Sequence, residues 1–303
     1  MFKTEKSKAM FKRISIIFLS VVFVVSAFIL IYELLWIPYK QSESTRKIQG
    51  VHGYIEGDSY EETFNKLREI NKDIKGWIYI SNTVINYPVL EPPSDDPAFY
   101  LFRDYEKNNS KYGSIFVDAT YGITEDLKNT VIHGHHMNDG KMFGDLLKYS
   151  DLDFYRTSPI VRYDTIYETG IWKIISVFKT NADSSQGEPF NYLQLTFSND
   201  SEFLNYIQDV KLRSIIDIPV DVRADDKLIT LSTCSYELDN FRTVVVARKV
   251  RYDESTEVDV NSASINPNPI YPDAWYEKYG GSKPSDKSFE DALKDGEIDW
   301  YTE

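Results

Sequence analysis

The feature that most constrains this chain is a run of uncharged, mostly apolar residues near its N-terminus, from residue 14 to residue 32. As a helix, these nineteen residues span about 30 Å, the thickness of the hydrocarbon core of a bilayer. Residues 1–13 carry five basic residues and one acidic residue, and the positive-inside rule keeps such a segment in the cytoplasm. The sequence therefore predicts a cytoplasmic basic segment (residues 1–13) and a single-pass membrane anchor (residues 14–37), with the rest of the chain outside the cell.

Two other structures share this hydropathy pattern. A cleaved signal peptide has a shorter apolar core and a small-residue cleavage site, whereas Glu33, Trp36 and Pro38 follow the run here. A buried core helix is the second alternative. The length of the run and its basic flank favour a retained signal anchor over both.

Export makes the single cysteine, Cys234, informative. One cysteine excludes an internal disulfide and a thiolate zinc cluster. Exported domains usually pair their cysteines or avoid them, so an unpaired one is either an inert buried thiol or a reactive nucleophile. The formal net charge of -13 argues against a nucleic-acid partner, because phosphates require a basic surface.

The exported part has the pattern of a mainly β domain. Residues 38–58 are polar and are predicted to be a linker, after which Ser59 and Glu62 have the spacing of a capping box that begins a helix. Eight short runs rich in β-branched and aromatic residues predict strands at 77–80, 84–90, 114–118, 130–133, 160–163, 170–179, 228–233 and 243–250. Two helical patterns lie at 142–149 and 201–210. Many short strands with few helices predict a barrel or a sandwich over residues 59–252.

Residues 253–303 form an acidic C-terminal extension, with thirteen Asp or Glu against four Lys. Its Pro and Gly residues interrupt any long regular element, and a solvated disordered tail is one interpretation. The extension also carries several large apolar residues, namely Tyr271, Trp275, Tyr276, Tyr279, Phe289, Ile298, Trp300 and Tyr301. The other interpretation is that these residues dock the extension onto the domain, where it could regulate entry of a substrate near Cys234. Residues 288–294 are predicted to form a short helix.

Cys234 ends the predicted strand 228–233 on its more polar face. Alternation places Thr230, Ser232 and Cys234 on one side of that strand. Arg242 begins the next strand, and an antiparallel pairing would bring it beside Cys234, about 4.8 Å across the ladder. A guanidinium there would stabilise a thiolate and an oxyanion, although a solvated charge at the strand end is an equally simple interpretation.

Three of the four histidines cluster at His133, His135 and His136, after a predicted strand and around Gly134. A thiol nucleophile needs an imidazole partner, and His135 or His136 could supply it. The same cluster invites a metal site, but the fourth histidine, His52, lies in the predicted linker and further ligands are lacking. No metal and no cofactor is predicted.

These segments together resemble the sortases, cell-wall transpeptidases of Gram-positive bacteria. Thr230-Leu-Ser-Thr-Cys234, with Arg242 eight residues on, resembles the TLxTC…R signature, and Val131-Ile-His-Gly-His135 looks like the histidine segment of class B members. The likeness includes residues 76–78, 85–90 and 113–118, and it covers roughly residues 58–251. It implies a sortase-type closed β-barrel of about eight strands with a few peripheral helices.

By this resemblance Cys234 is the nucleophile, His135 the catalytic histidine and Arg242 the catalytic arginine. His133 stands where class B members commonly have Tyr, and Tyr236 stands where some members have an acid. We therefore expect His133 and Ser232 to contact substrate. Glu237 or Asp239 could take the place of an acidic residue that orients the histidine.

The function implied is cleavage of a C-terminal sorting signal at a Thr peptide bond, followed by transfer of the acyl group to an amine. The donor would be a surface protein or pilin, and the acceptor a peptidoglycan cross-bridge amine or a pilin lysine. A class B likeness suggests an NPxTN-type signal, with an LPxTG-like signal as the alternative. Two other functions stay open: a cysteine hydrolase with water as acceptor, and a non-enzymatic surface adhesin.

Overall fold

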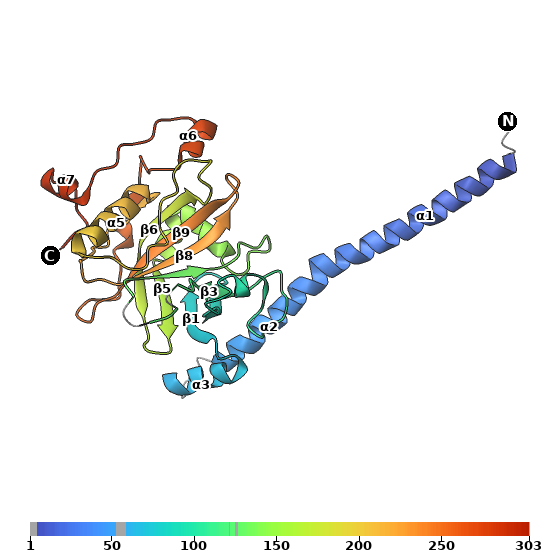
Figure 1. The fold of residues 1–303 in the computed structure, drawn as a ribbon, viewed down its shortest axis with the longest axis horizontal. Coiled ribbons are helices and arrows are strands. Elements are labelled where there is room, and N and C mark those ends of the chain that lie inside the picture. The colour runs from blue at the N-terminus through green and yellow to red at the C-terminus, as the bar shows by residue number, and fades with distance from the viewer. Residues whose placement is uncertain (1–4, 53–58, 121, 125–126, 303) are drawn as a thin grey trace. The chain divides into compact units, whose positions relative to one another are not determined.

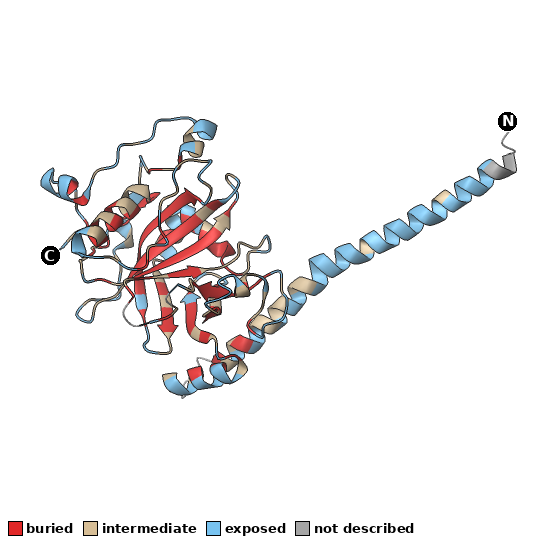
Figure 2. Ribbon diagram, in the orientation of Figure 1, coloured by how far each residue is buried: buried red, intermediate tan, exposed pale blue. Residues whose placement is uncertain are grey.

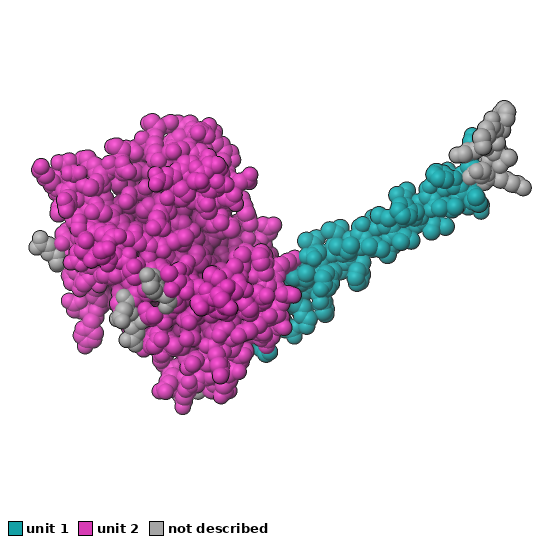
Figure 3. Space-filling view, in the orientation of Figure 1, with its two compact units in different colours: residues 1–50 teal, residues 51–303 magenta. Residues whose placement is uncertain are grey.

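The computed structural model describes residues 5–120, 122–124 and 127–302, except for residues 53–58. The chain divides into two compact units, residues 1–50 and residues 51–303 (Figure 3). Each unit is described by itself below.

The first unit is helical throughout its described length. Helix α1 (Glu5–Ile31) continues through a π-helical turn (Tyr32–Trp36) into α2 (Ile37–His52). Between Lys8 and His52 the helices contain a stretch long and apolar enough to cross a membrane, and its large apolar side chains are exposed (Figure 2).

The segment that the sequence assigned to a linker is helical as far as His52. It contains good helix formers, and the Nζ atom of Lys40 lies 3.3 Å from a carboxylate oxygen of Glu43, one turn away. A polar helix of this kind has no apolar periodicity from which it could be predicted. The rest of the predicted linker, residues 53–58, lies outside the described residues.

The second unit begins with α3 (Tyr60–Ile70), and the predicted capping box is confirmed. The hydroxyl of Ser59 accepts from the Glu62 amide at 3.2 Å, and the Glu62 carboxylate accepts from the Ser59 amide at 3.1 Å. Phe64 and Leu67 are the buried side chains of this helix.

A closed barrel of eight strands follows (Figure 1), so the predicted barrel is confirmed and the sandwich is wrong. The strand order around the barrel is β1-β2-β3-β4-β8-β9-β6-β5. The strands are β1 (Ile74–Ile80), β2 (Asn86–Leu90), β3 (Ile115–Val117), β4 (Asn129–His133), β5 (Ile160–Thr165), β6 (Ile171–Asn181), β8 (Leu228–Ser235) and β9 (Phe241–Lys249). Each corresponds to one predicted strand. The pairs β2–β3 and β4–β8 are parallel, and the other neighbours are antiparallel.

The connections carry short helices. A 3₁₀ helix (Phe99–Phe102) precedes β3, and a second (Gly144–Ser150) takes the place of the α-helix predicted at 142–149. Helix α4 (Leu152–Thr157) follows it, and α5 (Asp200–Arg213) confirms the second predicted helix. The barrel strands are almost wholly buried (Figure 2). Helix α5 packs against β6, where the Ser176 hydroxyl donates to the Val210 carbonyl at 2.8 Å.

The C-terminal extension is ordered along the second unit, so its aromatic residues do dock and the disordered alternative is wrong for the described residues. Strand β10 (Ser264–Ile265) pairs with β7 (Ile216–Asp217) in a two-stranded sheet. Helix α7 (Phe289–Lys294) packs beside α5, and α6 (Asp273–Tyr279) lies apart from both (Figure 1). Phe289 and Trp300 are buried, and Tyr301 forms a parallel bridge with Val222.

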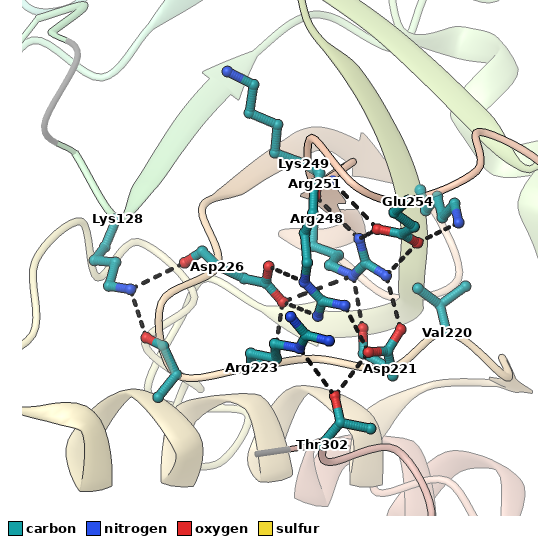
Figure 4. Close-up of polar contacts among 12 residues, drawn as sticks. Lys128, Val220, Asp221, Arg223, Asp226, Arg248, Lys249, Arg251, Glu254 and Thr302 are labelled. Atoms are coloured by element: carbon teal, nitrogen blue, oxygen red, sulfur yellow. Dashed lines mark hydrogen bonds and ion pairs between the residues drawn. The ribbon is translucent and has the colours of Figure 1, made fainter.

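A cluster of charged residues joins the end of β9 to the end of the chain (Figure 4). The guanidinium of Arg248 is fully buried and contacts Asp221 at 2.8 Å and Glu254 at 2.5 Å. Arg251 contacts Asp221 at 2.7 Å, and the Thr302 hydroxyl donates to the same carboxylate at 2.9 Å. The cluster therefore fastens the last described residues to the barrel.

Candidate active site

Cys234 lies one residue before the end of β8 and is the one cysteine of the chain, a partly exposed free thiol. The ladder between β8 and β9 pairs Cys234 directly with Arg242, as the sequence predicted. Arg242 also faces Thr180 of β6 on its other side. Neighbouring strands are about 4.8 Å apart, so the barrel fixes the backbones of Cys234 and Arg242 side by side.

His135 reaches the same end of the barrel through the parallel pair β4–β8. The register aligns His133, the last residue of β4, with Ser232, and the Gly134 amide donates to the Ser232 carbonyl at 3.2 Å just before His135. The Thr233 hydroxyl donates to the Gly134 carbonyl at 2.7 Å, which holds the two chains together at this point. The candidate residues Cys234, Arg242 and His135 thus come from three adjacent strands or strand ends.

Gly134 is required by close packing. A Cβ atom there would lie 2.4 Å from Ile115 Cδ1 and 2.7 Å from Phe143 Cδ2, distances at which carbon atoms overlap. The absence of a side chain lets the backbone pass between these two groups and deliver His135 beside β8.

The ring of His135 is oriented by a backbone carbonyl. Its Nε2 lies 2.7 Å from the carbonyl oxygen of Leu101, in the 3₁₀ helix before β3. A carbonyl can only accept, so Nε2 carries the proton and Nδ1 is the nitrogen left for proton transfer. The Phe102 ring packs beside the imidazole with a centroid distance of 5.6 Å.

Of the two carboxylates considered as orienters, that of Glu237 is engaged elsewhere. The side chain of Glu237 forms an ion pair with Lys179 at 2.7 Å, and its charge acts on His136. Among the described contacts, the partner of the His135 ring is Leu101 and neither Glu237 nor Asp239. This orienting group was not identified from the sequence, because every residue has a backbone carbonyl and no residue type marks the one that is used.

His136 supports the backbone around the nucleophile. Burial lowers the pKa of His136, and a hydrogen bond to the Cys234 backbone opposes that shift. Its ring stacks on Tyr236 at a centroid distance of 4.9 Å, and the Tyr236 hydroxyl donates to the His136 carbonyl at 3.3 Å. His136 therefore contacts the chain on both sides of Ser235, whereas His135 is held by Leu101.

The two predicted substrate contacts differ in their surroundings. Ser232 is buried and its hydroxyl lies 3.0 Å from that of Tyr192, so its described partner is internal and its contact with substrate stays a prediction. His133 is partly exposed, with Nε2 3.9 Å from the Asp118 carboxylate. The neighbouring His133 imidazole is the main cause that holds the pKa of Asp118 well below its usual range.

Tyr192 is a residue that the sequence analysis missed. Burial raises the pKa of Tyr192, and both Arg242 and Cys234 act on its hydroxyl electrostatically. Its hydroxyl contacts Ser232, two residues before Cys234 on β8. Its sequence context gave no signal, since it is one of 22 tyrosines in the chain.

Comparisons with known proteins agree with this geometry. The family model described as a sortase domain matches residues 78–250. Sortase B of Staphylococcus aureus is 35% identical over 190 residues, which cover 62% of this chain and 75% of that protein. Sortase B of Listeria monocytogenes is 40% identical over 178 residues, covering 57% of this chain and 67% of that protein.

Solved structures give the same result. A sortase B structure from Bacillus anthracis matches with a TM-score of 0.63 at 32% identity, covering 71% of this chain and 99% of that chain. A Staphylococcus aureus sortase B–substrate complex matches with a TM-score of 0.60 at 31% identity, covering 71% of this chain and 95% of that chain. The catalytic fold and its signature residues therefore have one common explanation: the chain belongs to the sortase family of cysteine transpeptidases, in its class B.

Proposed function

We propose that this sortase is anchored in the membrane by residues 14–37 and acts on sorting signals outside the cell through the catalytic domain 59–252. The observation that carries the proposal is that β9 pairs Arg242 with Cys234, while β4, on the other side of β8, ends two residues before His135. The apolar, exposed helix between Lys8 and His52 supports the anchor.

In the proposed reaction the Cys234 thiolate attacks the carbonyl carbon of a Thr residue in the signal. Arg242 and backbone N–H groups near Ser235 stabilise the oxyanion of the tetrahedral intermediate. Protonated His135 then gives its proton to the leaving amine as the C–N bond breaks, which leaves a thioester on Cys234. An incoming amine attacks the thioester and loses its proton to His135, and the thiolate is regenerated as the new amide forms.

The proposed donor carries an NPxTN-type signal, in keeping with the class B relatives, and an LPxTG-like signal is the alternative. The proposed acceptor is a peptidoglycan cross-bridge amine, with a pilin lysine as the alternative. One sortase B has been solved with substrate and another with triglycine, a short peptide with a free amine. Both partners of the proposed reaction therefore have counterparts among the relatives.

The test is incubation of the protein with peptides carrying each signal, with and without triglycine or a lysine peptide, read by mass spectrometry. We expect an amide joining the acyl fragment to the amine, at a rate that rises with amine concentration. Release of the free acid alone, unaffected by amine, would instead indicate a cysteine hydrolase. No cleavage of any signal would contradict the proposal.

Replacing His135 by Ala is expected to lower kcat/KM by about a hundredfold or more, because a positioned acid and base is lost. His136→Ala should cost much less, since its ring contacts backbone and Tyr236. His136→Phe is the matched control, because it keeps the ring stack on Tyr236 and should recover activity relative to His136→Ala. A larger loss of activity in His136→Ala than in His135→Ala would show that the His136 ring performs the proton transfer.

Arg242→Lys is expected to be nearly as damaging as Arg242→Ala, with a loss of about a hundredfold in kcat. Lysine keeps the charge but lacks the planar fork that can hold two oxygen atoms at once. The measurement is single-turnover acylation by a signal peptide. Recovery of most activity with Lys would mean that Arg242 acts only as a point charge on the thiolate.

A further inference from the structure

Helix α6 of the C-terminal extension contacts the loop that joins the nucleophile strand to the arginine strand. This loop, residues 236–240, lies between the end of β8 at Ser235 and the start of β9 at Phe241, and we name it the nucleophile loop. It carries the chain from Cys234 to Arg242. Its conformation therefore affects the geometry at both residues.

Two donors of α6 meet one acceptor in the loop. The Nζ atom of Lys278 donates to the Glu237 carbonyl at 2.6 Å, and the hydroxyl of Tyr279 donates to the same oxygen at 3.3 Å. The carboxylate of Glu237 is held from the other side by Lys179, a buried lysine of β6. Glu237 is thus fixed through both its backbone and its side chain.

Aromatic stacking extends the contact to the first residue of β9. The ring of Trp275 stacks on Phe241 at a centroid distance of 6.4 Å and an angle of 23°. Tyr271 also stacks on Trp275, at a centroid distance of 4.1 Å. Phe241 is fully buried, and its carbonyl accepts from the Arg242 guanidinium at 3.0 Å. The position of Phe241 therefore affects the catalytic arginine directly.

A relay through the loop after β6 holds the far end of the nucleophile loop. The backbone amide of Ala274 donates to the Gln186 carbonyl at 3.1 Å. The side chain of Gln186 in turn donates to the Asp239 carbonyl at 2.7 Å. The α6 segment thus reaches the nucleophile loop at Glu237 and Asp239, and the start of β9 at Phe241.

We propose that the C-terminal extension is a positioning element of the active site, in which Lys278, Trp275 and Tyr279 fix the nucleophile loop and with it the placement of Arg242 against the Cys234 thiol. The proposal rests on the assignment of Cys234 and Arg242 as catalytic residues. Residues 271–279 lie outside the part of the chain that matches the sortase family model. The contacts that residues 271–279 make with the nucleophile loop therefore come from outside the matched catalytic domain.

The test compares the full-length double variant Lys278→Met, Tyr279→Phe with the wild type. These changes remove both donors to Glu237 but keep the bulk of the side chains. Lys287→Met is the matched control, because Lys287 lies in the same extension and pairs with Asp295 and Glu297. Lys278→Arg, which keeps a donor, is the conservative variant.

Three measurements report how the double variant changes the nucleophile loop and the active site. Amide hydrogen exchange in residues 236–240 should be about tenfold faster in the double variant. The rate profile for alkylation of Cys234 by iodoacetamide should change, because the loop that joins Cys234 to Arg242 is less closely held. With a cleaved signal peptide, kcat should fall about tenfold while KM stays within about twofold, since misplacement affects the reacting groups more than binding. Lys278→Arg should keep most of the wild-type rate, and Lys287→Met should match the wild type.

Exchange and alkylation need no substrate, so they report on positioning even if the proposed transpeptidation is wrong. Unchanged loop exchange and an unchanged alkylation profile in the double variant would overturn the proposal. A rise in KM with normal kcat would also overturn it, because the extension would then contact substrate. Loss of peptide cleavage by all proteins, wild type included, would count against the proposed function alone.

Discussion

Cys234→Ala is expected to abolish acyl-enzyme formation and leave the barrel folded. In the proposed reaction the thiol sulfur forms the thioester bond, and no other cysteine exists in the chain to replace it. Cys234 is partly exposed at the end of β8, so its side chain contributes little packing and stability should change by about 1 kcal/mol or less. Mass spectrometry of the protein after incubation with a signal peptide measures the first effect, and thermal unfolding measures the second.

Iodoacetamide supplies the control for this variant. The wild type should gain one adduct and Cys234→Ala none, which shows that the modified group is this thiol. Retained turnover by Cys234→Ala would rule out the nucleophile assignment. Loss of the fold would show that the thiol has a packing role that its exposure does not indicate.

Arg248→Met is expected to give the largest loss of stability, about 3 kcal/mol or more of unfolding free energy. Arg248 is fully buried, and it contacts both Asp221 and Glu254. Without it, the described partners left to the Glu254 carboxylate are the Lys173 ammonium and the Arg251 backbone amide. Leaving a carboxylate without its buried partner lowers the free energy of unfolding strongly, even where the complete ion pair contributes little to that free energy. Urea unfolding of the second unit within the full chain is the measurement.

Acid titration adds an independent check on the same cluster. Burial by itself raises the pKa of Glu254, but hydrogen bonds from Arg248 and Lys173 outweigh it and lower that pKa to about 2. A lowered folded-state pKa means that this stabilisation is complete above the ordinary glutamate range near pH 4.5 and is lost as the pH falls toward 2. In Arg248→Met this acid dependence should be weaker.

The double variant Arg248→Met, Glu254→Gln separates a charge effect from a packing effect. Removing both charges together should recover part of the stability lost in Arg248→Met, because the uncompensated carboxylate is gone. Equal stability of wild type and Arg248→Met would contradict the prediction. A double variant no more stable than Arg248→Met would assign the loss to packing.

Much of the barrel was predictable because its strands are encoded locally. Alternating β-branched and aromatic residues located all eight strands, and Ser59 with Glu62 located the start of α3. The parallel pairing of β4 with β8 was not predictable, since it joins segments about one hundred residues apart and no local pattern encodes it. That pairing brings the end of β4, two residues before His135, beside β8.

The elements that were missed depend on contacts distant in sequence. Helix α6 has seven residues, too few for a stable isolated helix, and it forms where Trp275 meets Phe241. The orienting contact of His135 with Leu101 uses a backbone carbonyl, which any residue could provide. The pairing of Cys234 with Arg242 was predictable, because the two residues lie eight positions apart on antiparallel strands joined by one short loop.

The late position of the extension in the chain sets an order of folding. The barrel has all its strands once Lys249 has been synthesised, and domains fold progressively as the chain emerges. The bond from Lys278 of α6 to Glu237 closes a loop of 41 residues, and the bond from Thr302 to Asp221 closes one of 81. Neither bond can form before Lys278 and Thr302, which follow the barrel strands, have been synthesised. A newly made chain therefore has all its barrel strands before the residues that hold the nucleophile loop exist.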